Sequence, residues 1–402
     1  MIDAPLIIVI SVMVFVYGLV SRLLERTVIT APIVFVSVGV LLGPAGVSLL
    51  HIDLDAAIVR IVAELTLIII LFVEASHIKW KSLRSITGSI PVRLLAVGLP
   101  LTMIGGSLIG YALYSDLGIW PIVLMAVILS PTDAALGQAV TRSPVVPRHI
   151  RESISIESGL NDGIALVPVL VCLTALSSGG SIEGGTTNWL IVLVKQLTLG
   201  PLTGVLIGWG GGWLIDWASR KNWMSSVFQR LASLAFPVLA YAGAEIIQGN
   251  GFIAAFCAGL FLGIKNREAI SRLQEYGVAQ SQLLEYWIFL IVGIVAIPKY
   301  LAYWDTRALL YALLSLTFIR MVPVALSLIG SRLHWYSVAF LGWFGPRGMA
   351  SILYALLVIG TVGEEGYEQF LSVILLTITM SIFLHGMSSV PMANYYKRFS
   401  PG

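Results

Sequence analysis

Charged side chains are scarce in this chain. Asp, Glu, Lys and Arg make up 11% of its 402 residues, whereas a soluble protein would carry about a quarter. Hydrophobic residues account for 57% of the sequence. Because so few polar groups cannot cover the surface of a chain of this length, the composition excludes a water-soluble globular protein. It predicts a protein that crosses a membrane many times.

Several chemical motifs are also missing. The two cysteines, Cys172 and Cys257, lie in apolar segments, so we expect no disulfide framework. The sequence contains neither a Walker-type phosphate loop nor a His-Glu-x-x-His metalloprotease motif. We therefore expect no cofactor, no nucleotide and no nucleic-acid partner, and we interpret residues 1–402 as a single membrane domain.

Apolar runs of about 20 residues, the length that spans a bilayer, divide the chain. Thirteen such spans can be counted. They cover residues 4–23, 28–46, 54–75, 92–113, 119–141, 152–175, 188–217, 230–248, 250–264, 279–297, 307–330, 336–359 and 367–390. The predicted fold class is an all-α polytopic membrane protein.

Lys and Arg concentrate in alternate loops between these spans. The opposite loops hold only Lys299 and Arg307. Because positively charged loops stay on the cytoplasmic side, this asymmetry predicts an N-terminus outside and a C-terminus in the cytoplasm. The expected location is the cell (plasma or inner) membrane.

The fifth and twelfth spans are each interrupted. The interrupting runs are Ser130-Pro131-Thr132-Asp133 and Gly345-Pro346-Arg347-Gly348. Proline removes a helical hydrogen bond and clashes with the preceding turn. Interrupted helices at corresponding positions of two oppositely directed halves are typical of inverted-repeat transporters. We therefore predict a repeat of spans 1–6 and 8–13, with span 7 as the linker.

Each interruption carries one charge. We expect Asp133 to face the positive dipole end of the second half of its own span, the fifth. We expect Arg347 to face the negative dipole end of the first half of its own span, the twelfth. The sign of each charge suits the helix end predicted beside it.

A polar hexapeptide lies inside the sixth span: Glu157-Ser158-Gly159-Leu160-Asn161-Asp162. Ionisable residues at membrane depth are costly and indicate a functional site. On a helix Ser158 and Asp162 share one face, while Glu157 and Asn161 share the adjoining face. Such carboxylates can instead cap or pack the helices of a channel or a solute carrier, and that structural interpretation remains open.

Asp133 and the main-chain carbonyls freed around Thr132 can approach Asp162 and Ser158 from the interrupted fifth span. This set of oxygens, without His or Cys, suits a hard monovalent cation. A carboxylate can hold either a proton or a metal cation, but not readily both. This competition suffices to couple the fluxes of the two ions.

These motifs together resemble the NhaP-type sodium/proton antiporters of the monovalent cation:proton antiporter superfamily. The likeness extends to the run Glu64-Leu65-Thr66-Leu67-Ile68-Ile69-Ile70-Leu71-Phe72 and covers essentially the whole chain. The resemblance implies a homodimer in the lipid bilayer that exchanges Na⁺ or Li⁺ for H⁺ by alternating access. Spans 1–3 and 8–10 would form the dimerisation part, and spans 4–6 and 11–13 the moving core. A K⁺/H⁺ antiporter of the same fold is the alternative.

The resemblance also assigns residue roles. Asp162 would exchange cation for proton, and Asp133, Ser158 and the Thr132 carbonyl would complete the cation site. Asn161 would orient the site, and an Asn at this position is typical of the electroneutral branch, with one proton per cation. Glu157 would pair with Arg347. One departure is Ala134, where many relatives have proline.

Four further intramembrane residues have alternative or open roles, and a rival function uses two of the site residues. Arg320 either acts near the site or forms a structural pair, and Glu74 would line the inner entrance; Glu285 and His385 are left open. The rival is an intramembrane aspartyl protease with Asp133 and Asp162 as its catalytic pair. Thr rather than Tyr before Asp133, and the buried arginines, disfavour that chemistry, so we expect no enzyme.

Overall fold

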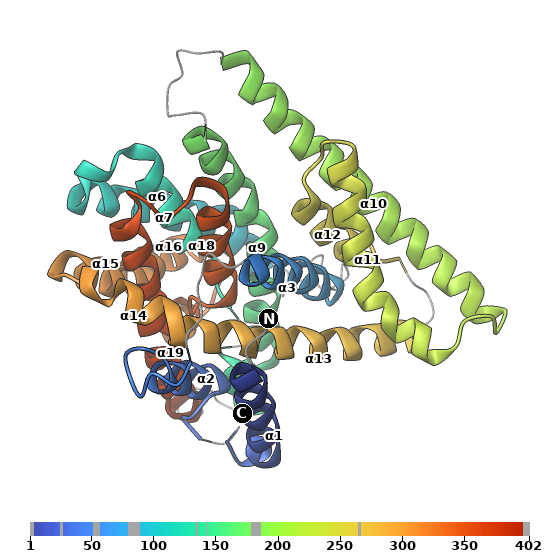
Figure 1. The fold of residues 1–402 in the computed structure, drawn as a ribbon, viewed down its shortest axis with the longest axis horizontal. Coiled ribbons are helices and arrows are strands. Elements are labelled where there is room, and N and C mark those ends of the chain that lie inside the picture. Colours follow the sequence, from blue (N-terminus) through green and yellow to red (C-terminus); the bar gives the residue numbers. More distant parts are fainter. Residues whose placement is uncertain are drawn as a thin grey trace. The chain divides into compact units, whose positions relative to one another are not determined.

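The computed structural model describes residues 4–24, 27–50, 57–78, 89–133, 136–141, 143–177, 186–263 and 267–396. These residues form helices and short connections, and none of them lies in a strand (Figure 1). The helices are α1 (Ala4–Leu24), α2 (Ala31–Leu42), α3 (Ala57–Ser76), α5 (Ser89–Arg93), η2 (Leu94–Gly98), α6 (Leu99–Leu113), η3 (Ser115–Leu117), α7 (Ile119–Ile128), α8 (Gln138–Thr141), α9 (Arg148–Ser177), α10 (Thr186–Arg220), α11 (Ser226–Ile246), α12 (Gly251–Leu260), α13 (Arg267–Ile291), η5 (Val292–Ala296), α14 (Ile297–Tyr300), η6 (Leu301–Tyr303), α15 (Thr306–Leu316), α16 (Phe318–Ser327), α17 (Trp335–Trp343), α18 (Met349–Val362) and α19 (Glu368–Tyr396). The all-α fold class predicted from the sequence is confirmed.

Eight helical segments of the described chain are long and apolar enough to cross a membrane. Four shorter apolar helices, α2, α7, α12 and α18, have 10–17 residues. At 1.5 Å per residue all four are too short to cross a hydrocarbon core of about 30 Å unaided. Helices overlap every predicted span, while the number of thirteen crossings stays a prediction.

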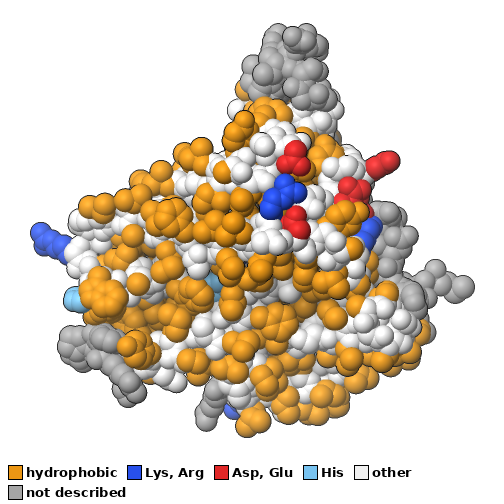
Figure 2. All heavy atoms as spheres, turned by 90° about the vertical axis from the view of Figure 1, so that its left-hand side faces the viewer, with side chains coloured by type: hydrophobic (Ala, Val, Ile, Leu, Met, Phe, Trp, Pro, Cys, Tyr) orange, Lys and Arg blue, Asp and Glu red, His pale blue; other side chains and the backbone are white. Residues whose placement is uncertain are grey.

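The surface is that of a protein surrounded by lipid. Hydrophobic side chains cover most of the face shown in Figure 2, and charged side chains gather at a few places. On α1 the exposed fractions of Phe15, Leu19 and Leu23 are 67%, 71% and 71%. A contiguous apolar surface of this kind is unfavourable in water, so it fits contact with acyl chains.

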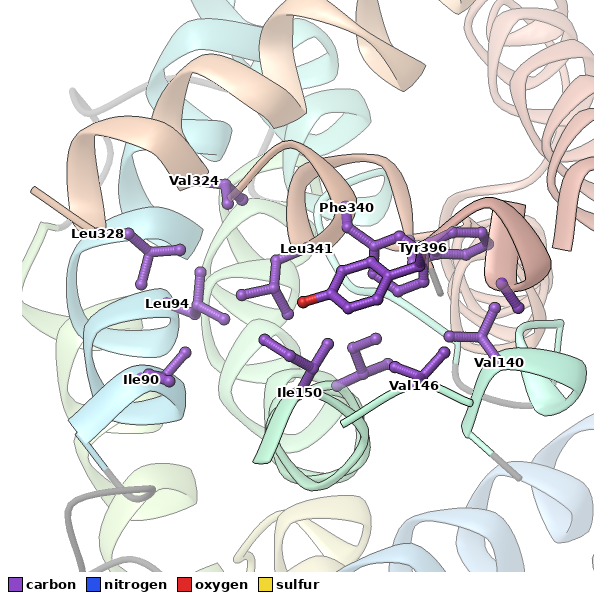
Figure 3. Close-up of a cluster of buried hydrophobic side chains, with 13 residues drawn as sticks. Ile90, Leu94, Val140, Val146, Ile150, Val324, Leu328, Phe340, Leu341 and Tyr396 are labelled. Atoms are coloured by element: carbon purple, nitrogen blue, oxygen red, sulfur yellow. The ribbon is translucent and has the colours of Figure 1, made fainter. Parts of the chain in front are cut away.

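The chain forms two compact units. The first contains residues 1–60, 80–161 and 285–402, and the second contains residues 61–79 and 162–284. A buried cluster in the first unit joins α9, α16, α17 and α19 (Figure 3). Its members are Ile90, Leu94, Val140, Val146, Ile150, Ile154, Val324, Leu328, Phe340, Leu341, Phe344, Ala393 and Tyr396. This packing fixes the helices that carry most of the polar residues described below.

Glycines allow close helix packing in the second unit, where α10, α11 and α12 contact one another (Figure 1). A Cβ at Gly204 would lie 2.7 Å from the Cys257 Cβ, and a Cβ at Gly208 would lie 2.8 Å from the Ala258 Cα. Both distances are shorter than van der Waals contact, so only glycine fits. Small residues four positions apart on one helix face allow this kind of close helix approach.

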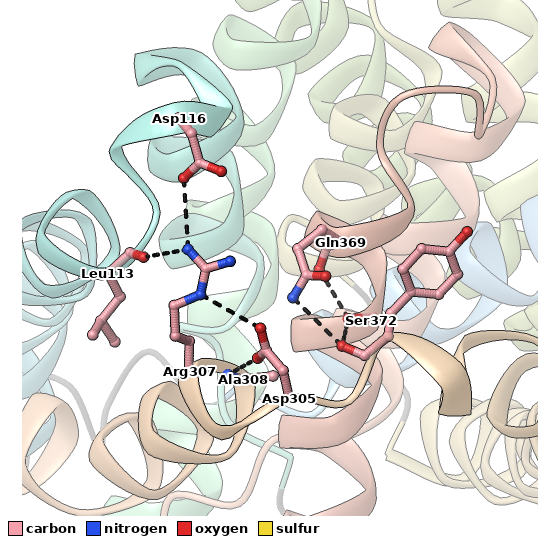
Figure 4. A network of polar contacts seen from close by, with 8 residues as sticks. Leu113, Asp116, Asp305, Arg307, Ala308, Gln369 and Ser372 are labelled. Atoms are coloured by element: carbon pink, nitrogen blue, oxygen red, sulfur yellow. Dashed lines mark hydrogen bonds and ion pairs between the residues drawn. The ribbon is translucent and has the colours of Figure 1, made fainter.

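A polar network ties the start of α15 to the segment after α6 in the first unit (Figure 4). The Arg307 guanidinium lies 3.9 Å from the Asp116 carboxylate and 3.4 Å from the Asp305 carboxylate. Asp305 also caps α15 by accepting the Ala308 N–H at 2.7 Å. The same guanidinium lies over the ring of Tyr114. Burial raises the pKa of Tyr114 to about 12, which keeps the phenol neutral.

Candidate cation site

Two non-helical segments meet in the first unit. Helix α7 ends at Ile128 and is followed by a turn and non-helical residues up to Asp133, while residues 344–348 separate α17 from α18. The Asp133 N–H donates to the Pro346 carbonyl at 2.8 Å. The Ser351 hydroxyl, in the first turn of α18, donates to the carbonyl of Ile128 at 2.6 Å. Both interruptions predicted from the sequence are therefore present, and they are hydrogen-bonded to each other.

The charged side chain of each interruption forms hydrogen bonds at the end of a helix that borders the other interruption. The Asp133 carboxylate accepts the N–H of Met349 at 2.9 Å, at the positive end of α18. The Arg347 guanidinium donates to the carbonyls of Ser130 and Pro131 at 2.7 Å and 3.2 Å, just beyond the negative end of α7. The predicted signs were right, but the expectation that Arg347 faces its own span was wrong, because its guanidinium binds carbonyls of the other interruption. Because the two segments pair, each charge reaches the other interrupted helix.

Gly348 permits this close approach, and we expect Gly348→Ala to disrupt it. A Cβ at position 348 would lie 2.7 Å from the Asp133 Cβ and 2.8 Å from its carboxyl carbon. The substitution should displace Asp133 and cost about 1–3 kcal/mol of stability. Thermal unfolding of the purified protein in detergent measures this loss.

Gly105→Ala is the matched control for that substitution. Gly105 lies within α6, and no atom lies within 4 Å of the position that its Cβ would occupy. Because Ala favours helix over Gly by about 1 kcal/mol, this variant should be as stable as the parent or slightly more so. Equal stability of the two variants would contradict the steric role of Gly348.

Helix α9 contacts the same interruption through Thr132. The Ser158 hydroxyl donates to the Thr132 carbonyl at 2.8 Å, and the Asn161 amide donates to the Thr132 hydroxyl at 2.6 Å. All three residues are buried. The structure thus brings Ser158 and Thr132 together as predicted. The sequence assigned Ser158 and Asn161 to two adjoining faces of the helix, but both side chains bind Thr132.

Asp162 lies one turn after Ser158 on the continuous helix α9. Its exposed fraction is 5%, and that of Asp133 is 7%. No three His, Cys, Asp or Glu residues of the described chain cluster as metal ligands. The oxygens beside the interruption are hydroxyls, a main-chain carbonyl and a carboxylate, the donor types that suit a hard cation.

Glu157 pairs with Arg320, and the prediction that it pairs with Arg347 was wrong. The Glu157 Oε1 and Arg320 Nη2 atoms are 2.6 Å apart, with both side chains at most 3% exposed. Arg347 is instead held by main-chain carbonyls. Arg320 lies in the first turn of α16 and packs on Gly345, where a Cβ would lie 2.9 Å from the guanidinium carbon. Arg320 therefore has the structural pairing that we considered as one of its two roles.

The structure assigns no role to two residues that the sequence singled out. Glu74, near the end of α3, is half-buried, and its place at an inner entrance stays a prediction. Ala134 lies outside the described residues, so its departure from the related sequences has no structural account.

Ser381 and His385 on α19 were missed as parts of this region. The Ser381 hydroxyl accepts the main-chain N–H of Arg347 at 2.7 Å, and His385 contacts Ser381 one turn later. A signal was available, because buried polar residues recur every four positions along this apolar helix. These are Thr377, Ser381, His385 and Ser389.

Comparison with known proteins gives a consistent result. The family model for sodium/hydrogen exchanger, transmembrane, matches residues 9–395. Among curated proteins, the K(+)/H(+) antiporter NhaP of Alkalimonas amylolytica is 28% identical over 400 residues, covering 97% of this chain and 67% of that protein. The K(+)/H(+) antiporter NhaP2 of Shewanella oneidensis is 26% identical over 388 residues, covering 94% and 65%. This chain thus spans about two thirds of the length of these relatives.

A solved structure shares the fold. The sodium proton antiporter MjNhaP1 from Methanocaldococcus jannaschii superposes with a TM-score of 0.74 and 21% sequence identity. The match covers 96% of this chain and 100% of that one. At this identity the likeness establishes the architecture, and the two proteins need not carry the same ion.

Proposed function

This chain belongs to the sodium/hydrogen exchanger family, and from that premise we propose that it exchanges a monovalent cation for protons across the membrane. The family assignment agrees with the NhaP-type resemblance of the sequence motifs. It sets aside the intramembrane aspartyl protease, because the matching proteins are antiporters.

The observation that carries the proposal is that two side chains of α9 donate hydrogen bonds to Thr132, which lies in one of the two paired interruptions. Ser158 and Asn161 hold Thr132 from one side, and Asp133 follows it in the chain with its carboxylate at the start of α18. Main-chain oxygens outside a helix at membrane depth are tolerated only where protein or a water-filled cavity covers them. In the proposal these oxygens, with Ser158, Asp133 and Asp162, coordinate the cation, and Asp162 releases a proton when the cation binds.

We propose Na⁺ or Li⁺ as the exchanged cation, with K⁺ as the specific alternative. The similar proteins of Alkalimonas and Shewanella are named as K(+)/H(+) antiporters, whereas the protein of similar structure is a sodium proton antiporter. These ions demand different cavity sizes from the same kind of oxygen ligands. Competition of either ion with the proton would couple the two fluxes.

The proposed arrangement is a homodimer in the cell membrane with its N-terminus outside. The distribution of basic residues supports this orientation, because the predicted outer loops hold only Lys299 and Arg307. Spans 4–6 and 11–13 would move against the dimerisation part.

Flux measurements in proteoliposomes that enclose a pH-sensitive dye test the proposed function. Pulses of Na⁺, Li⁺ and K⁺ should each be applied, with choline as the inert cation and protein-free liposomes as the blank. We expect at least one of the three metal ions to drive proton movement well above the blank. No response to any of them would overturn the proposal, and the ranking of the responses decides the ion.

Electroneutral exchange is a separate expectation that rests on Asn161 in place of a second aspartate. With one proton exchanged per cation, no net charge moves. Clamping the membrane potential with valinomycin and K⁺ should therefore leave a Na⁺-driven steady-state pH gradient unchanged. A gradient that follows the imposed potential would contradict the one-to-one ratio while leaving antiport itself intact.

A further inference from the structure

The buried polar side chains along α19 fall into two groups, according to whether their hydrogen-bond partners lie on the same helix or outside it. The hydroxyls of Thr377 and Ser389 donate to carbonyls of their own helix, at Val373 and Gly386, with distances of 2.7 Å and 2.8 Å. Such bonds satisfy a hydroxyl inside an apolar helix without any further partner. Ser381 and His385 instead contact the interruption between α17 and α18.

The first contact links His385 to the main chain of Arg347 through the Ser381 hydroxyl. The Arg347 N–H donates to the Ser381 hydroxyl oxygen at 2.7 Å, and that oxygen lies 3.2 Å from the His385 Nδ1 atom. The same Nδ1 atom lies 3.1 Å from the Ser381 main-chain carbonyl, which can only accept, so Nδ1 carries the proton of a neutral imidazole and donates to both oxygens. The Ser381 hydroxyl oxygen is then held by the imidazole and by the N–H of Arg347.

The second contact lies on the other side of the same interruption. The ring of Trp343, the last residue of α17, lies over the ring of His385 with centroids 4.8 Å apart. The Trp343 indole N–H donates to Ser388 at 3.0 Å. His385 is 1% exposed, so one buried imidazole contacts the end of α17 directly and the non-helical segment through Ser381.

This segment in turn positions the candidate cation site. The Arg347 guanidinium binds the carbonyls of Ser130 and Pro131, the two residues before Thr132. A shift of the Arg347 backbone would therefore move the peptide that presents the Thr132 carbonyl. Hydrogen bonds and the intervening main chain therefore connect His385 on α19 to the Thr132 carbonyl.

We propose that His385 is a positioning residue for cation exchange. It fixes the Ser381 hydroxyl, which holds the Arg347 backbone and thereby the peptide that presents Thr132 to the cation. His385 does not touch the cation in this proposal, which rests on the proposed function.

Two substitutions of His385 distinguish the effect of its hydrogen-bonding nitrogen from the effect of its side-chain volume. In His385→Asn the side-chain amide stands near the place of Nδ1, whereas in His385→Gln it extends toward the place of Nε2. We expect His385→Asn to keep the apparent KM for the cation within about twofold of the parent, and His385→Gln to raise it about tenfold, the effect of one lost buried hydrogen bond. Dye-based flux over a range of cation concentrations, in whichever of Na⁺, Li⁺ or K⁺ the parent uses, gives the KM.

A double-substitution cycle tests whether His385 acts through Ser381. Ser381→Ala should raise the apparent KM to a similar extent, and adding His385→Gln to it should change the KM little further, because residues acting in series are not additive. Ser389→Ala is the matched control. It removes a buried hydroxyl of the same helix that bonds to its own helix, and it should exchange as the parent does.

Each outcome decides the proposal. Rescue by Asn but not Gln, with non-additive loss at Ser381, supports it. A parent-like KM for His385→Gln, equal effects of Asn and Gln, or additive losses would overturn it while the proposed function stood. Gel filtration of every variant before reconstitution ensures that only folded protein is compared. A parent protein that exchanges none of the three cations would overturn the proposed function, and this inference with it.

Discussion

Asp162→Asn is expected to abolish cation-driven proton movement. The amide has almost the size and shape of the carboxyl group, so the buried position on α9 should keep its packing. However, the amide cannot exchange a proton for a cation, and it loses the charge that attracts the cation. The rate should fall by about a hundredfold or more, to the level of protein-free liposomes, since losing one charged interaction of about 3 kcal/mol suffices for that factor.

Asp216→Asn is the matched control for that experiment. Asp216 is also a buried aspartate of a long helix, 4% exposed, but it pairs with Arg220 one turn later on α10. This variant should exchange ions at close to the parent rate. Residual exchange in a folded Asp162→Asn protein, or equal losses in both variants, would contradict the assignment of Asp162 as the exchanging carboxylate.

The interruptions were predictable because their cause is local. Pro131 and Pro346 lack the N–H that a continuous helix needs, and Gly348 admits a neighbour that any side chain would exclude. The polar run on α9 was equally visible, because a carboxylate inside an apolar segment stands out in any sequence. Local chemistry therefore indicated both where the helices break and which residues lie beside the break.

The partners of the charged residues were not predictable in the same way. The resemblance implied that Glu157 pairs with Arg347, but Arg347 binds carbonyls beyond the end of α7 and Arg320 pairs with the Glu157 carboxylate. Which helix end a guanidinium reaches depends on how the two interrupted segments cross, and that is a tertiary property. His385 was left without a role for a related reason: its partner Ser381 is an uncharged residue in a helix that is apolar on average.

The buried pair Glu157–Arg320 leads to the second large expected effect, on stability. In Glu157→Gln the guanidinium of Arg320 stays buried without its counter-charge, and arginine cannot release a proton to relieve this. We expect a loss of about 3–5 kcal/mol in the free energy of unfolding. In Arg320→Met the stranded group is a carboxyl, which can take up a proton, so the loss should be smaller. Denaturant titration of the purified protein in detergent ranks the two variants.

The double variant Glu157→Gln/Arg320→Met should recover most of that loss, because it buries no charge at all. The exposed pair Arg148–Glu152 on α9 is the matched control, with side chains 83% and 35% exposed. Neutralising both of its members should change stability by less than about 1 kcal/mol. If the double variant at Glu157 and Arg320 were as unstable as Glu157→Gln alone, the cost would come from lost packing rather than from a stranded charge. If it were stable but unable to exchange ions, the pair would serve transport, the functional role that the sequence left open for Arg320.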